Sequence, residues 1–213
     1  MQTLNFSTPD DADELARAEV YGLLSRLFYA PPDAALYAQL QVAVTEAPAR
    51  GAFLERSWGE LVAASRRLPL AEVQDEYADL FVGVGKLNEK PLVELRRDLT
   101  ALGLERPDTV NETEDHLASL CEVMRYLIAG DDLAVSNLAA QQRFYNAHLR
   151  GWVESFCDAL AAHPKADFYR ALAGFARDFF AVEAQGLDLL DAEAVTKLTG
   201  SPAFSPAARH KPD

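Results

Sequence analysis

The chain has 213 residues, of which 49% are apolar and 25% charged. This is enough apolar sequence to bury a core in one domain, and it excludes wholesale disorder. The formal net charge of −13 disfavours nucleic acid, whose phosphates it would repel, and favours a cationic partner, although acidity that serves only solubility explains it equally well. Two isolated cysteines, no basic and apolar leader, and no run of about 18 apolar residues predict a cytoplasmic protein without stable membrane insertion.

The first half of the chain is predicted to be helical, after a flexible N-terminus over residues 1–9. A helix from about residue 10 ends at Pro31-Pro32, and its apolar positions have the spacing of a core-facing stripe: Val20, Leu23, Leu24, Leu27 and Phe28. Further helices are predicted over 33–47, 52–67, 70–83 and 91–103. The helix over 70–83 places Val73, Tyr77, Leu80 and Phe81 on one face, and a flexible loop near 83–90 follows it.

The second half begins with a polar connector over 105–113. The helix that follows has the clearest apolar stripe of the chain, formed by Leu117, Leu120, Cys121, Met124, Leu127 and Ile128, and Gly130-Asp131-Asp132 ends it and begins the next. Another stripe runs from Leu149 to Leu160, and a final long helix runs from Phe168 to near Leu190. Residues 191–213 are predicted to be a disordered tail. The expected fold is an all-α, single-domain bundle of about nine helices over residues 10–190.

The stretch Asn111-Glu112-Thr113-Glu114-Asp115-His116 brings together ionisable side chains that invite a metal or catalytic interpretation. Di-iron bundles need a glutamate three residues before a histidine, but those positions hold Thr113, Tyr145, Leu160 and Ala207. The sequence also lacks a nucleophile elbow and a Walker loop, and Cys121 and Cys157 fit packing positions. We therefore expect no metal, no cofactor and no catalytic residues.

Two interpretations of the stretch remain. In the first it is a helix cap, with Thr113 or Asn111 accepting from a backbone N–H and with Glu114 and Asp115 in the first turn. In the second it belongs to a surface that binds a cationic peptide, with His116 at the edge of the buried face. Carboxylates bind arginine through paired hydrogen bonds, and aromatic rings stack on its guanidinium.

A second group of acids interleaves with aromatic residues in the helix predicted over 70–83. It comprises Glu72, Asp75, Glu76 and Asp79, with Tyr77 and Phe81 between and beyond them. This pattern fits a groove for a peptide that carries arginines and apolar residues. The pattern alone favours a solvated helix face whose aromatic side chains, Tyr77 and Phe81, lie in the core.

Several segments in order resemble the TorD/DmsD/NarJ-type chaperones of molybdenum-containing redox enzymes. The resemblance runs from about residue 13 to about residue 190. "EYADLFVG" (76–83) is similar to a Y-x-x-L-F-x-G motif of that family, "NETEDHLASL" (111–120) to its E-P-x-D-H segment, and "HLRGW" (148–152) to its H-x-x-P-W. The opening helix, which ends in Leu27-Phe28-Tyr29-Ala30-Pro31, and "FYRALAGFARDFF" (168–180) complete the series. Thr113 and Gly151 stand where the family motifs have proline.

The resemblance implies a cytoplasmic, non-enzymatic chaperone. Such a protein binds the twin-arginine signal peptide of a molybdenum-containing oxidoreductase precursor and holds the precursor until cofactor insertion. The expected peptide-binding residues are Glu76, Tyr77, Phe81, Glu112, Glu114, Asp115, His116 and Trp152. A homodimer formed by helix exchange is a further expectation. The alternatives are a nucleotide-binding or nucleotide-hydrolysing helical protein, prompted by Gly83 and Gly85, and an acidic helical scaffold that dimerises.

Overall fold

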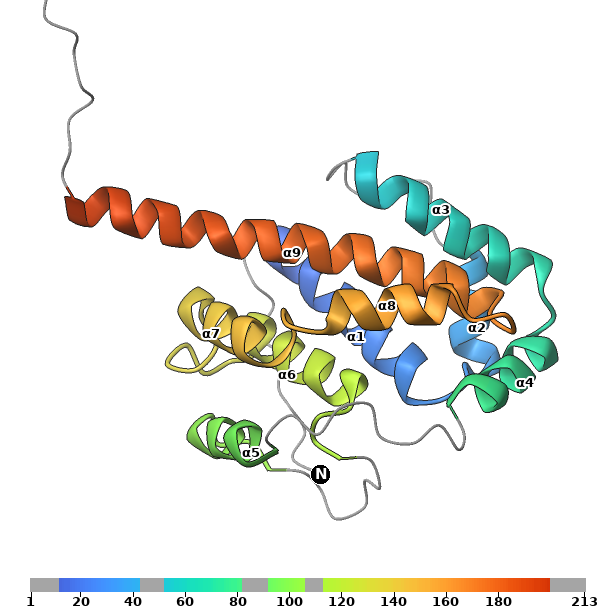
Figure 1. The fold of residues 1–213 in the computed structure, drawn as a ribbon, viewed down its shortest axis with the longest axis horizontal. Helices are drawn as coiled ribbons and strands as arrows, with labels where there is room; N and C mark the ends of the chain where they lie inside the picture. Colours follow the sequence, from blue (N-terminus) through green and yellow to red (C-terminus); the bar gives the residue numbers. More distant parts are fainter. Residues whose placement is uncertain (1–11, 43–51, 82–91, 106–112, 200–213) are drawn as a thin grey trace, which may run out of the picture.

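A computed structural model describes residues 12–42, 52–81, 92–105 and 113–199. Within these ranges the chain forms nine helices and no strand, which confirms the all-α class (Figure 1). The helices are α1 (Ala12–Tyr29), α2 (Ala34–Val42), α3 (Ala52–Arg67), α4 (Leu70–Phe81), α5 (Leu92–Ala101), α6 (Leu117–Ala129), α7 (Leu138–His148), α8 (Val153–Ala161) and α9 (Phe168–Thr199). The predicted N-terminus, the loop near 83–90 and most of the connector over 105–113 fall outside the described ranges.

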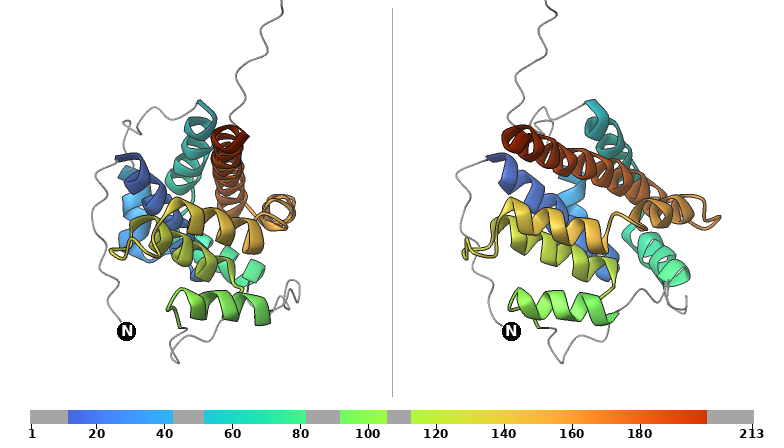
Figure 2. Two further views of the ribbon diagram at one scale, coloured as in Figure 1. Left: turned by 90° about the vertical axis from the view of Figure 1, so that its left-hand side faces the viewer. Right: turned by 60° about the vertical axis from the view of Figure 1, so that its left-hand side comes forward.

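Helix α1 lies at the centre of the bundle, between α6 and the long helix α9 (Figures 1 and 2). Its predicted stripe is largely confirmed, since Leu24, Leu27 and Phe28 are buried while Val20 and Leu23 pack half-buried at the margin of the core. Tyr21 lies one turn away in the same core and contacts the rings of Phe179 and Phe180 of α9.

Helix α6 packs antiparallel to α1. Towards its C-terminus, the Leu127 carbonyl accepts from Gln141, whose own carbonyl accepts from Arg17 near the start of α1. The side chain of Arg125 in α6 lies against Gly22 of α1, and a Cβ atom at Gly22 would be 3.0 Å from it. All six residues of the predicted α6 stripe are buried. The beginning of α6 therefore lies near the end of α1, at the end of the molecule where α4 is found (Figure 1).

Three predicted boundaries were wrong. Helix α7 begins at Leu138 and not directly after Gly130, because Asn137 caps its N-terminus by accepting from the Ala140 N–H. The stripe predicted from Leu149 to Leu160 is divided, since Leu149 is the C-cap of α7 and α8 starts at Val153. Helix α9 continues past Leu190 to Thr199, beyond the other described helices (Figure 1).

Candidate functional site

The beginning of α6 is capped by His116. Its Nδ1 atom accepts a hydrogen bond of 3.2 Å from the Ala118 N–H, which requires that nitrogen to be unprotonated and places the proton of a neutral ring on Nε2. The predicted cap was therefore wrong in its residue. Glu114 and Asp115 precede the helix and do not form its first turn, while Thr113 contributes only its backbone carbonyl, which accepts from the His116 N–H. Asn111 and Glu112 are not among the described residues.

The carboxylate of Glu114 binds the guanidinium of Arg96 from α5. The two hydrogen bonds, from Nε to Oε1 and from Nη2 to Oε2, are both 3.0 Å long and form the paired geometry typical of arginine and carboxylate. Hydrogen bonding to Glu114 and the charge of that group raise the pKa of Arg96, and Asp115 contributes in the same direction. Asp115 is half-buried and makes no hydrogen bond or ion pair with another described residue.

A second contact joins α5 to the end of α7. His148 Nε2 lies 2.9 Å from Asp98 Oδ2, and the His148 side chain is only 10% exposed. The carbonyl oxygen of His148 accepts a 2.7 Å hydrogen bond from the indole N–H of Trp152, which fixes the orientation of that ring. Helix α5, which lies at the edge of the molecule in both views of Figure 2, is thus tied to the segment before α6 and to α7.

The predicted aromatic residues from α4 and from the α7–α8 turn are joined by the rings of Phe28 and Phe156, which were not among the predicted site residues. Trp152 contacts Phe156 of α8, Phe156 contacts Phe28 of α1, Phe28 contacts Phe81, and Phe81 contacts Tyr77, with centroid distances of 5.9, 5.7, 6.5 and 4.9 Å. We call these five residues the aromatic strip. All except the buried Phe28 are half-buried, so the strip is continuous with the core but retains exposed edges.

Two neighbouring residues of α4 cap the ends of two other helices. Glu76 is 8% exposed, and its carboxylate accepts hydrogen bonds of 2.7, 3.0 and 2.8 Å from the backbone N–H groups of Asp167, Phe168 and Tyr169 at the start of α9. Tyr77 donates to the Tyr29 carbonyl at the end of α1, at 2.7 Å. Both oxygens of the Glu76 carboxylate therefore already accept hydrogen bonds from the backbone of α9 and the residue before it.

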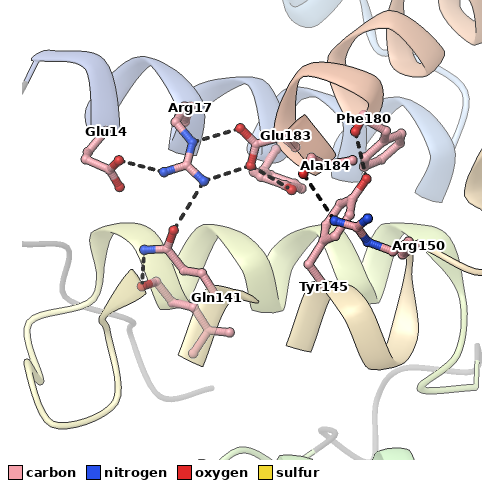
Figure 3. Close-up of polar contacts among 10 residues, drawn as sticks. Glu14, Arg17, Gln141, Tyr145, Arg150, Phe180, Glu183 and Ala184 are labelled. Carbon is pink, nitrogen blue, oxygen red and sulfur yellow. Dashed lines mark hydrogen bonds and ion pairs between the residues drawn. The ribbon is translucent and has the colours of Figure 1, made fainter. Parts of the chain in front are cut away.

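A buried cluster of charges at the opposite end of α1 was missed by the sequence analysis. Arg17 donates two hydrogen bonds of 2.8 Å to the carboxylate of Glu183 in α9, and also binds Glu14 and Gln141 (Figure 3). Burial on its own lowers the pKa of Arg17. Hydrogen bonding to Glu183 and the charges of Glu183 and Glu14 raise this pKa by more than burial lowers it, so the guanidinium stays charged. No local pattern marks Arg17 and Glu183 as partners, since they are far apart in the sequence.

The remaining chemistry candidates are placed as follows. Cys121 and Cys157 are free and buried, and burial raises the pKa of both thiols, that of Cys157 to about 12. Across the part of the chain that the structure describes, no group of three or more His, Cys, Asp or Glu side chains could hold a metal ion. None of the helices in that part is long and apolar enough to cross a membrane.

Comparison with known proteins places these residues in a family. The profile of the family described as "Nitrate reductase delta subunit" matches residues 48–158, just over half of the chain, and this range contains all the predicted site residues. The chaperone protein TorD of Vibrio cholerae serotype O1, strain O395, is 31% identical over 120 residues, which are 54% of this chain and 54% of the relative. The TorD protein of strain N16961 matches equally over the same shares.

The chain thus spans about half the length of the curated relatives that it matches. The match to the family profile confirms the resemblance that the motifs indicated, and it covers α3 through most of α8. The relatives are named chaperones, in agreement with the expectation of a non-enzymatic protein. The chain belongs to the nitrate reductase delta subunit family.

Proposed function

We propose that this protein is a cytoplasmic chaperone for the precursor of a molybdenum-containing redox enzyme. It binds the twin-arginine leader of the precursor and holds the precursor until its cofactor is inserted. The observation that carries the proposal is the segment Glu114–His116, whose Glu114 carboxylate binds a guanidinium in the geometry that a leader arginine needs. The names of the similar TorD proteins support the chaperone role.

The binding surface in this proposal has a polar part and an apolar part. Glu114, Asp115 and His116 provide the polar part at the start of α6, with Glu112 added through its place in the motif. Tyr77, Phe81 and Trp152 provide the apolar part, because their half-buried rings in the aromatic strip can receive apolar side chains of the leader. We leave Glu76 out of the surface, since its oxygens accept three backbone hydrogen bonds at the start of α9.

The polar part is tested by titration calorimetry with a synthetic peptide that contains two adjacent arginines followed by apolar residues. Asp115→Asn should weaken binding about ten-fold, since hydrogen bonds to charged groups contribute roughly 1.5–3 kcal/mol. His116→Asn is measured beside this variant, because asparagine removes the imidazole but retains a side-chain oxygen that can cap α6. Replacing the arginines of the peptide by glutamine should cause a loss of similar size.

A matched control comes from the other end of the same helix. Asp131→Asn removes the same charge from an exposed residue just beyond α6 and should leave the affinity unchanged. An affinity that is indifferent both to Asp115→Asn and to the arginines of the peptide would contradict the proposal. Higher salt should weaken binding of the wild type, because it screens exposed charges.

The proposal also includes a homodimer formed by helix exchange. Helix α9 supports it, since this helix carries the exposed side chains of Val182 and Leu189 and continues past the other described helices (Figure 1). The Val182 side chain is 41% exposed and the Leu189 side chain is 66% exposed, so a second copy of the chain could cover them.

A further inference from the structure

Arg96 already occupies the carboxylate that the proposed function assigns to a leader arginine. Its Nε and Nη2 atoms bind the two oxygens of Glu114 at 3.0 Å each. A guanidinium forms this planar, paired contact with one carboxylate at a time along this edge, so a second arginine cannot make the same two hydrogen bonds while Arg96 is in place. The chain itself therefore carries a ligand of the chemistry that the site is proposed to recognise.

The two partners differ in exposure in the way expected for a site and its occupant. The Glu114 side chain is only 12% exposed, whereas the Arg96 side chain is 54% exposed. The carboxylate is thus held against the protein while the arginine reaches it from solvent. Arginine has several rotatable bonds, so Arg96 can turn into water without any movement of α5.

The position of α5 does not depend on this ion pair. Leu95 and Leu99 bury one side of the helix, and Asp98 binds His148 of α7. An exposed ion pair contributes little to folding stability, typically less than about 1 kcal/mol. Loss of the Arg96 contact should therefore leave the fold intact and alter only what the Glu114 carboxylate can bind.

We propose that Arg96 is an internal competitor of the client, held in the guanidinium site of Glu114 until a leader arginine displaces it. This inference rests on the proposed function and adds a specificity device to it. A peptide with a single arginine and no apolar segment makes too few contacts with the protein to displace Arg96. A leader with two arginines and an apolar segment offsets the loss with its other contacts.

The test compares two arginine variants of α5 in the full chain. Arg96→Ala should tighten binding of the synthetic twin-arginine peptide about two- to five-fold, which corresponds to the usual contribution of an exposed ion pair. Arg97→Ala is the matched control, since Arg97 is the next residue of the same helix and carries the same charge. The Arg97 side chain is 73% exposed, and its Nη2 atom lies 3.4 Å from Asp98 Oδ1, farther than Arg96 lies from Glu114. Arg97→Ala should leave the affinity for the peptide unchanged.

A second variant identifies the competing group. In the Arg96→Ala background, Glu114→Gln should remove the gain, because the carboxylate that Arg96 binds in the wild type no longer exists. A gain that persists in Arg96→Ala, Glu114→Gln would show that Arg96 acts only through its general charge and would overturn the inference. Thermal melts of each variant by circular dichroism verify that the helices are intact.

The outcomes separate this inference from the proposed function. If the wild type binds the peptide and Arg96→Ala binds it no more tightly than Arg97→Ala, the internal competitor is refuted while the chaperone function stands. If Arg96→Ala binds the peptide and the wild type does not, the internal competitor is supported, whereas leader binding by the wild-type protein is not. If neither the wild type nor Arg96→Ala binds it, the assignment of leader binding fails and the competitor fails with it.

Discussion

At the scale of single residues, the most buried ion pair among the described residues is that of Arg17 and Glu183. Glu183 is 5% exposed and Arg17 is mostly buried, and Tyr21 adds a hydrogen bond to the same carboxylate at 3.1 Å. Taking two charges out of water costs several kcal/mol for each ion, and the paired geometry offsets that cost only while both partners are present. Removing one partner therefore leaves an uncompensated buried charge.

We predict that Arg17→Ala lowers the free energy of unfolding by roughly 3–5 kcal/mol, as measured by urea denaturation. Arg150→Ala is the control, because Arg150 also pairs with α9, through Asp188, but both side chains of that pair are partly exposed. Its loss should cost about 1 kcal/mol or less. Equal losses in the two variants would contradict the prediction, since the buried carboxylate of Glu183 would then not need Arg17 as its partner.

At the scale of elements, side chains of α4 link the end of α1 to the beginning of α9. Helix ends leave backbone N–H and C=O groups without partners, and both ends are satisfied here by side chains from a third helix. Glu76 accepts from three N–H groups of α9, where its negative charge also favours the positive end of the helix dipole. Tyr77 donates to the last turn of α1.

We predict that Glu76→Ala lowers the free energy of unfolding by about 2–3 kcal/mol, because three charge-assisted hydrogen bonds disappear and the N–H groups remain buried. Hydrogen exchange should show the loss of protection first at Phe168 and Tyr169. Glu72→Ala, an exposed glutamate one turn earlier in the same helix, should have an effect below about 0.5 kcal/mol. If Glu76→Ala lowered the free energy of unfolding no more than Glu72→Ala does, the hydrogen bonds from the start of α9 to Glu76 would not contribute to stability.

At the scale of the whole molecule, the core holds ionisable groups that are stable only when neutral. Burial raises the pKa of Cys121 and Cys157, in the second case to about 12, and it also raises the pKa of Tyr21, Tyr145 and Tyr169. In the unfolded chain a thiol ionises near pH 8.5. Above that pH the unfolded state releases protons that the folded state keeps, so the folded state loses stability as the pH rises towards the folded pKa.

We predict that the buried thiols do not affect the free energy of unfolding below about pH 8.5, and that this free energy falls steadily between about pH 8.5 and about pH 10. The variant Cys157→Ala should show a shallower fall than the wild type, since one of the buried thiols is then absent. Both thiols should resist a thiol-specific reagent near pH 8 until denaturant is added. Rapid labelling of the native protein at that pH would contradict their burial.

The sequence by itself determined the fold class and most helix cores, because apolar periodicity is a local property of the chain. The predicted stripe of α6 is buried, that of α1 is buried at Leu24, Leu27 and Phe28, and Pro31-Pro32 marks the end of α1. The motifs around Glu76, Glu114 and Trp152 were also sufficient to indicate the family, which the profile match confirms.

Only the tertiary structure decided which partner each charged side chain has. Glu76 caps α9, Glu114 binds Arg96, and Arg17 binds Glu183. Each of these contacts joins a helix to another helix or to the segment before α6. A carboxylate in a sequence has the same local appearance whether it caps a distant helix or awaits a ligand, because its partner is set by packing and not by spacing. The same reason explains the aromatic strip, which Phe28 and Phe156 complete from helices that the motifs did not connect.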